Sequence, residues 1–176
     1  MSRLMEIEGS LSLYLKVNGK KCSMLSFSFI DGKLIGAGNQ TIAFISCLQR
    51  IGKRAELTER AINHFNDIIP AAILMKALEA LCSSLDVKCC AGVAASNQLS
   101  FKNAADYEKY EAIYDKFWEQ NGAQQQADNY LIALPLYQKD ILSVKQTHRN
   151  RVRKKRQKLD GIYQKCSTVF GFMANA

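Results

Sequence analysis

The stretch "LSLYLKVNGKKCSMLSFSFIDG", residues 11–32, decides the fold. Apolar side chains occupy alternate positions on both sides of its centre, which is the period of a strand with one buried face. Asn18-Gly19 between the two runs is the strongest two-residue signal for a hairpin. Asp31-Gly32 marks a second turn at the end of the second run. The stretch therefore predicts two antiparallel strands joined by a tight turn.

The strand pattern continues after the second turn. A third strand is predicted near residues 33–36, and "TIAFISCLQ", residues 41–49, is predicted as a buried fourth strand. Together these segments predict a strand meander over about residues 4–48.

Helical spacing replaces the strand period further along the chain. Apolar residues recur every three or four positions from Glu56 to Leu85, and Pro70 lies inside this run. Because proline is tolerated only in the first turn of a helix, we expect two helical pieces, with Pro70 starting or kinking the second. The remaining segments predict, in order, a strand in "VKCCAGVAAS" (residues 87–96), a helix in "AADYEKYEAIYDKFWEQNG" (residues 104–122), a strand in "NYLIALPLY" (residues 129–137) and a long basic amphipathic helix over about residues 144–170.

This order of elements predicts a single α+β domain over residues 1–176, with a central, mostly antiparallel sheet and flanking helices. The helices and strands that follow the meander occupy about residues 55–135. An apolar content of 48% and a charged content of 23% are values typical of a globular chain.

Composition also excludes several classes of protein. No apolar run approaches the roughly 20 residues of a membrane-spanning helix, and the N-terminus lacks the apolar region of a secretory signal. Six cysteines without a CxxC motif, together with only two histidines, argue against a metal site. We expect buried thiols in a reducing cytoplasm, and hence a cytoplasmic protein.

An ordered set of segments resembles the VirK/YbjX family of bacterial proteins over about Ser10 to Tyr163. The set comprises "LSFSF", "ISCLQ", "IIPAAILMKALEALCSSLDV", "GV", "YDKFWEQNGA", "LIALP" and "HRNRVRKKRQKLDGIY". The resemblance implies a link to virulence, envelope homeostasis and tolerance of antimicrobial peptides. Members of that family usually carry an additional N-terminal region, which we expect this chain to lack.

A second resemblance concerns the fold. A meander followed by a strand–helix–strand–helix–strand series is similar to the core of the GNAT acyltransferases, which implies a GNAT-like core. Those enzymes hold the pyrophosphate of an acyl-CoA at the N-terminus of the helix after the fourth strand, on the motif Gln/Arg-x-x-Gly-x-Gly/Ala. Gln49 and Gly52 match this motif here, whereas Arg54 stands where a small residue is expected.

The GNAT resemblance implies an acyl-CoA or an acyl-carrier protein as cofactor, held around Gln49, Arg50, Gly52, Lys53 and Arg54. Free N–H groups at a helix N-terminus favour an anion, and three of these side chains add positive charge. An ordinary solvated loop between a strand and a helix is the alternative reading of the same residues.

GNAT enzymes also often carry a tyrosine as general acid four residues before a glycine. Trp118 occupies that position here, ahead of Gly122, and an indole cannot supply the proton. Tyr114, one turn earlier, is therefore the candidate general acid. The aromatic stripe at positions 107, 110, 114 and 118 equally fits the packed face of a helix.

Residues 145–158, here called the basic segment, contain eight Lys or Arg and no acid. Their charge equals the formal net charge of +8 of the whole chain. An apolar stripe at helical spacing runs through and beyond the segment at Val144, Val152, Leu159, Ile162, Cys166 and Val169. The basic segment is therefore predicted to begin a packed helix and not a loose tail.

Several cations of the basic segment are predicted to face a ligand. His148 and Lys155 fall on the same face as the apolar stripe, and Arg149 and Arg153 lie in a band beside it with Lys145 and Arg156. The predicted anion-binding residues are His148, Arg149, Arg153 and Lys155, because a cation on a buried face needs a partner. That partner could be a carboxylate such as Asp115, Glu119 or Asp140, a bound phosphate, or an acyl-carrier surface. A solvated face, with Lys155 extending to water, is the alternative. Arg151, Lys154 and Lys158 are predicted to point to water.

Two classes of function stay open. The first is a transferase dependent on acyl-CoA or acyl-carrier protein, or a degenerate relative that only binds such a ligand. The second is a binding protein without catalysis, whose basic helix engages RNA, DNA or an anionic membrane surface through nonspecific, salt-dependent contacts. A ligand at residues 49–54 would favour the first class, whereas binding that survives mutation of that loop would favour the second.

Overall fold

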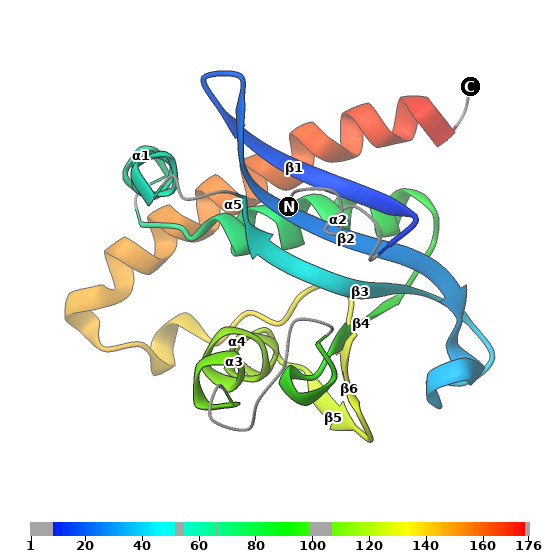
Figure 1. Ribbon diagram of the computed structural model, residues 1–176. Helices are drawn as coiled ribbons and strands as arrows, with labels where there is room; N and C mark the ends of the chain where they lie inside the picture. Colours follow the sequence, from blue (N-terminus) through cyan, green and yellow to red (C-terminus); the bar gives the residue numbers. More distant parts are fainter. Residues whose placement is uncertain (1–8, 52–54, 66, 99–106, 175–176) are drawn as a thin grey trace. The chain divides into compact units, whose positions relative to one another are not determined.

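The computed structural model describes residues 9–51, 55–65, 67–98 and 107–174 (Figure 1). The strands are β1 (Leu11–Val17), β2 (Lys20–Asp31), β3 (Thr41–Arg50), β4 (Cys89–Val93), β5 (Gln124–Gln126) and β6 (Asn129–Ala133). The α-helices are α1 (Ala55–His64), α2 (Pro70–Ser84), α3 (Tyr107–Ile113), α4 (Asp115–Gln120) and α5 (Gln146–Ala174). Three short 3-10 helices are η1 (Gly32–Ile35), η2 (Ala95–Asn97) and η4 (Ile141–Ser143).

The strands form a six-stranded sheet in the order β1-β2-β3-β4-β6-β5. β3 and β4 are parallel, with Ala43 opposite Cys90 and Ile45 opposite Gly92. A parallel pair requires a crossover connection, which α1 and α2 supply. β6 pairs antiparallel with β4 and with β5. The predicted α+β class with a mostly antiparallel sheet and a long C-terminal helix is confirmed, and the GNAT-like core stays a prediction.

The chain divides into two compact units, each assembled from three segments. The first unit contains residues 1–12, 26–47 and 87–137, and the second contains residues 13–25, 48–86 and 138–176. The expected single domain over residues 1–176 stays a prediction.

The chain turns after β1 at Asn18-Gly19 and after β2 at Asp31-Gly32, as the sequence indicates. Asn18 and Gly19 both have positive φ, 50° and 74°, which is the conformation that a two-residue hairpin requires. The third strand predicted near residues 33–36 is wrong, because η1 occupies that place. The Asp31 side chain accepts a hydrogen bond from Lys33 N at 3.0 Å and caps the 3-10 turn, and Gly36 ends it at a φ of 74°. The strand at residues 41–50 is therefore the third in the chain and not the fourth.

Trp118 organises the packing of the first unit. Its side chain is 1% exposed, and its indole N–H donates to the Val93 carbonyl at the end of β4, at 3.1 Å. Gly92 lies directly under the indole, where a Cβ atom would overlap the ring. Trp118 is thus a core residue, as predicted. Gly122 follows α4 with a φ of 79° and ends the helix, which confirms the predicted stop.

Two features of the first unit differ from the expectation. The helix expected over residues 104–122 is divided at Tyr114 into α3 and α4, although the backbone hydrogen bonds from Tyr114 to Tyr110 and from Trp118 to Tyr114 continue across the break. The glutamines at 124–126 form the edge strand β5, which their polar side chains conceal in the sequence. Gln126 Nε2 donates to Gly36 O at 2.7 Å and ties this edge to the end of η1.

The second unit contains the three longer helices. Pro70 is the first residue of α2, as predicted, because the proline nitrogen has no N–H to lose from the helix ladder at that position. α2 buries residues on most of its circumference, which is typical of a central helix. α5 packs along α2, as Figure 1 shows. No described helix is long and apolar enough to cross a membrane.

Candidate functional site

The N-terminal end of the basic segment is fastened by Arg149. Its Nε donates to Val144 O at 2.9 Å and its Nη2 donates to Leu142 O at 2.8 Å. η4 is itself ordered by Asp140, whose carboxylate accepts from Leu142 N at 2.9 Å. The guanidinium thus closes the connection between η4 and α5. Because its acceptors are neutral carbonyls, the positive charge of Arg149 is not cancelled by these contacts.

Arg156, seven residues further along α5, makes the same kind of contact. Its Nη2 donates to the carbonyl oxygen of Lys139. Arg153, between Arg149 and Arg156, is exposed, and its Nη1 lies 3.5 Å from the Asn150 side-chain oxygen. Arg149, Arg153 and Arg156 therefore form the band that the helical spacing predicted, and Arg153 is the member of this band that reaches solvent.

A second row of cations, which consists of Arg151, Lys155 and Lys158, reaches the connection between α1 and α2. Arg151 Nη2 lies 2.6 Å from Asp67 Oδ2, and Lys155 Nζ donates to Asp67 O at 2.9 Å. Lys158 Nζ donates to His64 O at 3.1 Å. Arg151 is exposed, as expected, and also reaches Asp67, whereas Lys158 is half-buried and reaches the same connection, so the expectation that it points to water is wrong. Lys155 is half-buried and has a carbonyl partner, so it does not simply extend to water.

The carboxylate that meets the basic segment was missed by the sequence reasoning. Asp67 lies 84 residues from Arg151, whereas the sequence suggested Asp115, Glu119 or Asp140. Asp67 has a positive φ of 61°, a backbone conformation that aspartate tolerates better than most residues. In a sequence, such a residue between two helices is an ordinary turn residue, so no local signal marks it as the partner of a distant arginine.

His148 does not lie on the buried face of the helix. Its side chain is exposed, so this expectation is wrong. Val152, Leu159, Ile162 and Cys166 are half-buried, whereas Val169 is 56% exposed. The apolar stripe is therefore confirmed in the middle of α5 and is wrong at its C-terminal end. The anion-binding role of His148, Arg149, Arg153 and Lys155 stays a prediction.

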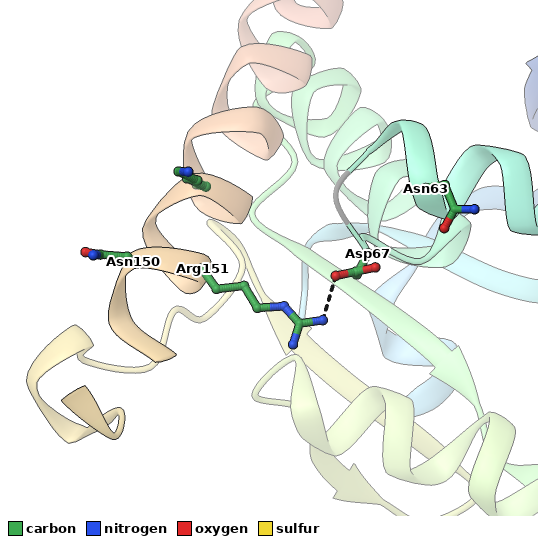
Figure 2. A pocket seen from close by; sticks show the side chains of 5 residues that line it. Asn63, Asp67, Asn150 and Arg151 are labelled. Atoms are coloured by element: carbon green, nitrogen blue, oxygen red, sulfur yellow. Dashed lines mark hydrogen bonds and ion pairs between the residues drawn. The ribbon is translucent and has the colours of Figure 1, made fainter. Parts of the chain in front are cut away.

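A surface hollow lies beside the second row of cations (Figure 2). It has a volume of about 520 Å³ and is lined by Asn63, Asp67, Asn150, Arg151 and Lys154. Figure 2 shows Arg151 extending from α5 toward Asp67, with Asn63 on the neighbouring α1. Amide, guanidinium and ammonium donors predominate in this lining, which suits a ligand rich in anionic oxygens.

The charge of the basic segment is left largely uncompensated. In the part of the chain that the structure describes, Arg151 is the cation of this segment that forms an ion pair with a carboxylate. The side chains of Arg151 and Asp67 are 61% and 52% exposed, so water screens even this pair. The arrangement holds several cations in fixed positions and leaves their attraction for a further anion intact.

The loop expected to hold a pyrophosphate is described only in part. β3 ends at Arg50, and α1 begins at Ala55, so the loop connects a strand to a helix as predicted. Gln49 O accepts from Ser23 Oγ at 2.9 Å, and Ile51 N donates to Cys22 O at 3.0 Å, which anchors the start of the loop. Gly52, Lys53 and Arg54 lie outside the described residues. The phosphate-binding role of Gln49, Arg50, Gly52, Lys53 and Arg54 therefore stays a prediction.

Tyr114, the candidate general acid, is 6% exposed and lies at the junction of α3 and α4. Its ring stacks on Tyr110, with 6.2 Å between centroids and 10° between planes. Tyr114 belongs to the first unit and the basic segment to the second. Its catalytic role stays a prediction.

Asp115, next to Tyr114, is a buried carboxylate that the sequence did not single out for chemistry. Its Oδ1 accepts from Ala95 N at 2.7 Å, which caps η2 at the end of β4. Burial raises the pKa of this carboxyl, the Ala95 hydrogen bond opposes the rise, and the nearby Glu111 and Glu119 add to it. Its buried position, one residue after the break at Tyr114, is set by the fold and has no signature in the sequence.

Across the described ranges, no group of three or more His, Cys, Asp or Glu could hold a metal ion. All six cysteines are free thiols, and four of them are buried. The described residues therefore supply cations, hydrogen-bond donors and the buried carboxyls of Glu79 and Asp115.

Comparison with known proteins places the chain in a family. Neither the curated proteins nor the solved structures contain a match to it. The profile of the family described as "Protein of unknown function (DUF535)" matches residues 1–168. Because DUF535 is the VirK/YbjX family, the ordered segments quoted from the sequence indicated the same family. The chain belongs to the DUF535 family.

Proposed function

We propose that the protein binds a phosphate-bearing ligand on the basic segment of α5. The observation that supports this proposal is the way the cations are held. Arg149, Lys155, Arg156 and Lys158 donate to backbone carbonyls, which fix the side chains without neutralising them. A prearranged set of cations binds an anion with less loss of side-chain freedom than a mobile set.

The distribution of charge between the two units supports the same proposal. The second unit carries 18 Lys or Arg against 7 Asp or Glu, whereas the first carries 6 against 9. A concentration of one sign of charge raises the rate at which oppositely charged ligands arrive. The segment lacks the groove-reading motifs of sequence-specific nucleic-acid binders, so the contacts are with phosphate groups and not with bases.

The experiment compares Arg153→Gln/Lys154→Gln with a control that removes equal charge from the same unit, Lys16→Gln/Lys20→Gln. Arg153 and Lys154 are exposed, and within the described residues neither donates to a backbone carbonyl, so their replacement leaves the fastening of α5 intact. Lys16 and Lys20 are equally exposed cations of the β1–β2 hairpin. Lys154 is exposed, as expected, and it lines the hollow beside Arg151, which is why it is included in the site variant.

The probes are a fluorescein-labelled single-stranded oligonucleotide and coenzyme A. The logarithm of the association constant for the oligonucleotide should fall linearly with the logarithm of salt concentration. The site variant should lower the slope of that line by about 1.4, because each lost phosphate contact contributes about 0.7 on a single strand. The control should change the slope much less. Equal losses in both variants would contradict a defined site, and no binding of either probe at low salt would refute the proposal.

A second candidate, transfer of an acyl group from acyl-CoA or an acyl-carrier protein, is favoured by the sheet topology. The parallel pair β3–β4, with its crossover through α1, has the strand–helix–strand order that resembles GNAT enzymes. The start of α1 follows directly after the loop at residues 49–54, at the carboxyl end of β3. Ligands of open α/β sheets commonly bind at the carboxyl ends of the strands.

The Arg50→Gln variant separates the two candidates. Arg50 is exposed at the end of β3 and makes no contact with the basic segment in the described residues. If the loop holds the pyrophosphate, this variant should weaken coenzyme A binding about as strongly as Arg153→Gln/Lys154→Gln does. If Tyr114 is the acid, Tyr114→Phe should lower turnover of an acyl-CoA far more than its binding. Unchanged binding of coenzyme A by the Arg50 variant would exclude the loop as the site that holds the pyrophosphate.

A further inference from the structure

One face of α5 runs from the basic segment to the C-terminal end of the helix. Residues 154, 158, 165, 169 and 172 follow one another at intervals of four, seven, four and three, so they fall within about 60° of each other at 100° per residue. We call these five residues the outer stripe of α5. It is about 27 Å long at 1.5 Å per residue.

The outer stripe changes from cationic to apolar along the helix. Lys154, Lys158 and Lys165 occupy its first part, and Val169 and Phe172 occupy its end. Lys154 and Lys165 are exposed, whereas Lys158 is half-buried and donates to His64 O at 3.1 Å. Phe172 is 76% exposed and Val169 is 56% exposed, the two large apolar side chains of α5 that face solvent to such an extent among the described residues. Asp160 is the acid within α5, and its angular position lies well outside this stripe.

Small residues flank the stripe between its lysines and its apolar end. Gly161 has no neighbouring heavy atom within 4 Å of the place where a Cβ would be, so the surface beside it is open. Thr168 is exposed, and its hydroxyl donates back to Gln164 O at 3.0 Å, so the donor is satisfied within the helix. The surface of α5 beside Gly161 and Thr168 is therefore open, whereas Arg151 and Lys158, nearer the start of the helix, reach the connection between α1 and α2.

An isolated exposed apolar residue needs no explanation, but the combination on one face does. Lysines with long flexible stems beside an exposed aromatic ring are the composition of helices that lie in the interface of a lipid bilayer. The ammonium groups meet phosphate headgroups, and the ring enters the boundary between headgroups and acyl chains. Phe172 could also stack on a nucleic-acid base, whereas Val169 beside it offers no surface for stacking and suits an apolar boundary.

We propose that the outer stripe of α5 docks on an anionic lipid surface, with Phe172 and Val169 inserted at the interface. This inference rests on the proposed function, because Lys154 and Lys158 belong to the basic segment. It names the ligand of that segment as the phosphate of a lipid headgroup. Neither a spanning helix nor a covalent anchor is required, since each cation near an anionic surface strengthens binding about fivefold.

The experiment measures sedimentation of the full chain with vesicles of phosphatidylcholine, with and without phosphatidylglycerol. The site variant is Val169→Ser/Phe172→Ser, and the matched control is Leu34→Ser on η1, where the side chain is also 76% exposed. Partitioning onto anionic vesicles should fall about tenfold or more in the site variant, because the apolar burial is lost. Partitioning should stay at the parent level in the control. None of the three proteins should bind vesicles of phosphatidylcholine alone.

A second readout tests insertion directly. The chain has a single tryptophan, Trp118, which is buried, so Phe172→Trp introduces one exposed indole. Its fluorescence should shift to shorter wavelength with anionic vesicles and not with the soluble oligonucleotide. Equal vesicle binding by parent and Val169→Ser/Phe172→Ser, or no spectral shift for Phe172→Trp, would overturn the inference.

The soluble probes separate this inference from the proposed function. Val169→Ser/Phe172→Ser should bind the oligonucleotide and coenzyme A as the parent does, whereas Arg153→Gln/Lys154→Gln should lose affinity for vesicles and oligonucleotide together. A parent that binds the soluble probes but not anionic vesicles refutes the lipid surface and leaves the proposed function standing. A change of oligomeric state in the Phe172 variant, without anionic vesicle binding by the parent, would assign the stripe to a second copy of the chain and refute the inference.

Discussion

Removing one member of the buried ion pair on α2 should destabilise the protein strongly. Lys76 Nζ lies 2.7 Å from Glu79 Oε2, and the two side chains are only 9% and 5% exposed. Lys76 also lies over the ring of Tyr163 on α5, 5.9 Å from its centroid. The pair therefore lies on the side of α2 that faces α5. Its loss should weaken the packing of the helix that carries the basic segment.

The magnitude follows from the burial. Lys76→Met keeps the length of the side chain but removes the cation 2.7 Å from the buried Glu79 carboxylate, which should lower the free energy of unfolding by about 3–5 kcal/mol. That is a large share of the roughly 5–15 kcal/mol that stabilises a typical domain. The double variant Lys76→Met/Glu79→Leu removes both charges and should recover most of the loss, because a packed apolar pair is often as stable as a buried ion pair.

Urea unfolding followed by circular dichroism measures both effects. The exposed pair Lys116–Glu111, at 3.9 Å with side chains 56% and 38% exposed, provides the control, and Lys116→Met should lower stability by less than about 1 kcal/mol. A loss in Lys76→Met no larger than in Lys116→Met would refute the reasoning, because it would mean that water reaches the pair. A double variant as unstable as Lys76→Met would show that the two charges do not act mainly on each other.

Three further outcomes are expected. Because burial raises the pKa of Asp115 in the folded state, the stability that its protonated form supports is present below the unfolded pKa and is lost as pH rises through the folded pKa. Asp115→Asn should abolish that loss, so the urea midpoint of the variant should rise relative to the parent as pH increases above the ordinary aspartate pKa of about 4. Gly92→Ala should lower the free energy of unfolding by about 1–3 kcal/mol, since the new methyl group overlaps the Trp118 indole, and a shift in tryptophan fluorescence should report the displaced ring. Burial raises the pKa of the Cys22 and Cys166 thiols, so iodoacetamide at about pH 8 should alkylate both more slowly in the folded than in the urea-unfolded chain.

Local signals in the sequence predicted those elements that local physics controls. Asn18-Gly19 needs no distant residue to adopt positive φ, and Pro70 fits only the first turn of a helix wherever that helix packs. The wrong strand at residues 33–36 and the missed strand at residues 124–126 have separate causes. At the first site an aspartate side chain caps a 3-10 turn, and at the second the polar glutamines form an edge strand whose side chains face no apolar core.

The candidate site was predictable in composition and not in geometry. The apolar stripe indicated that the basic segment is a packed helix, because 100° per residue is a property of the backbone. It gave no information on which neighbours flank the stripe. Asp67 and the carbonyl of His64 come from the connection between α1 and α2, and that connection is brought to α5 by tertiary folding alone. The sequence thus identified the cations but assigned several of them to the wrong surroundings.

The packing of α2 on α5 bears on how the protein is made. Residues 85–145 separate the two helices, and a ribosome adds about 5–20 residues per second. For several seconds after α2 has been synthesised, the helix that will cover it does not yet exist. During that interval its apolar side and the charged pair at Lys76 and Glu79 are open to water and to other chains. We therefore expect nascent chains halted before Gln146 to be bound by chaperones that recognise apolar helices, and release to follow once α5 has emerged.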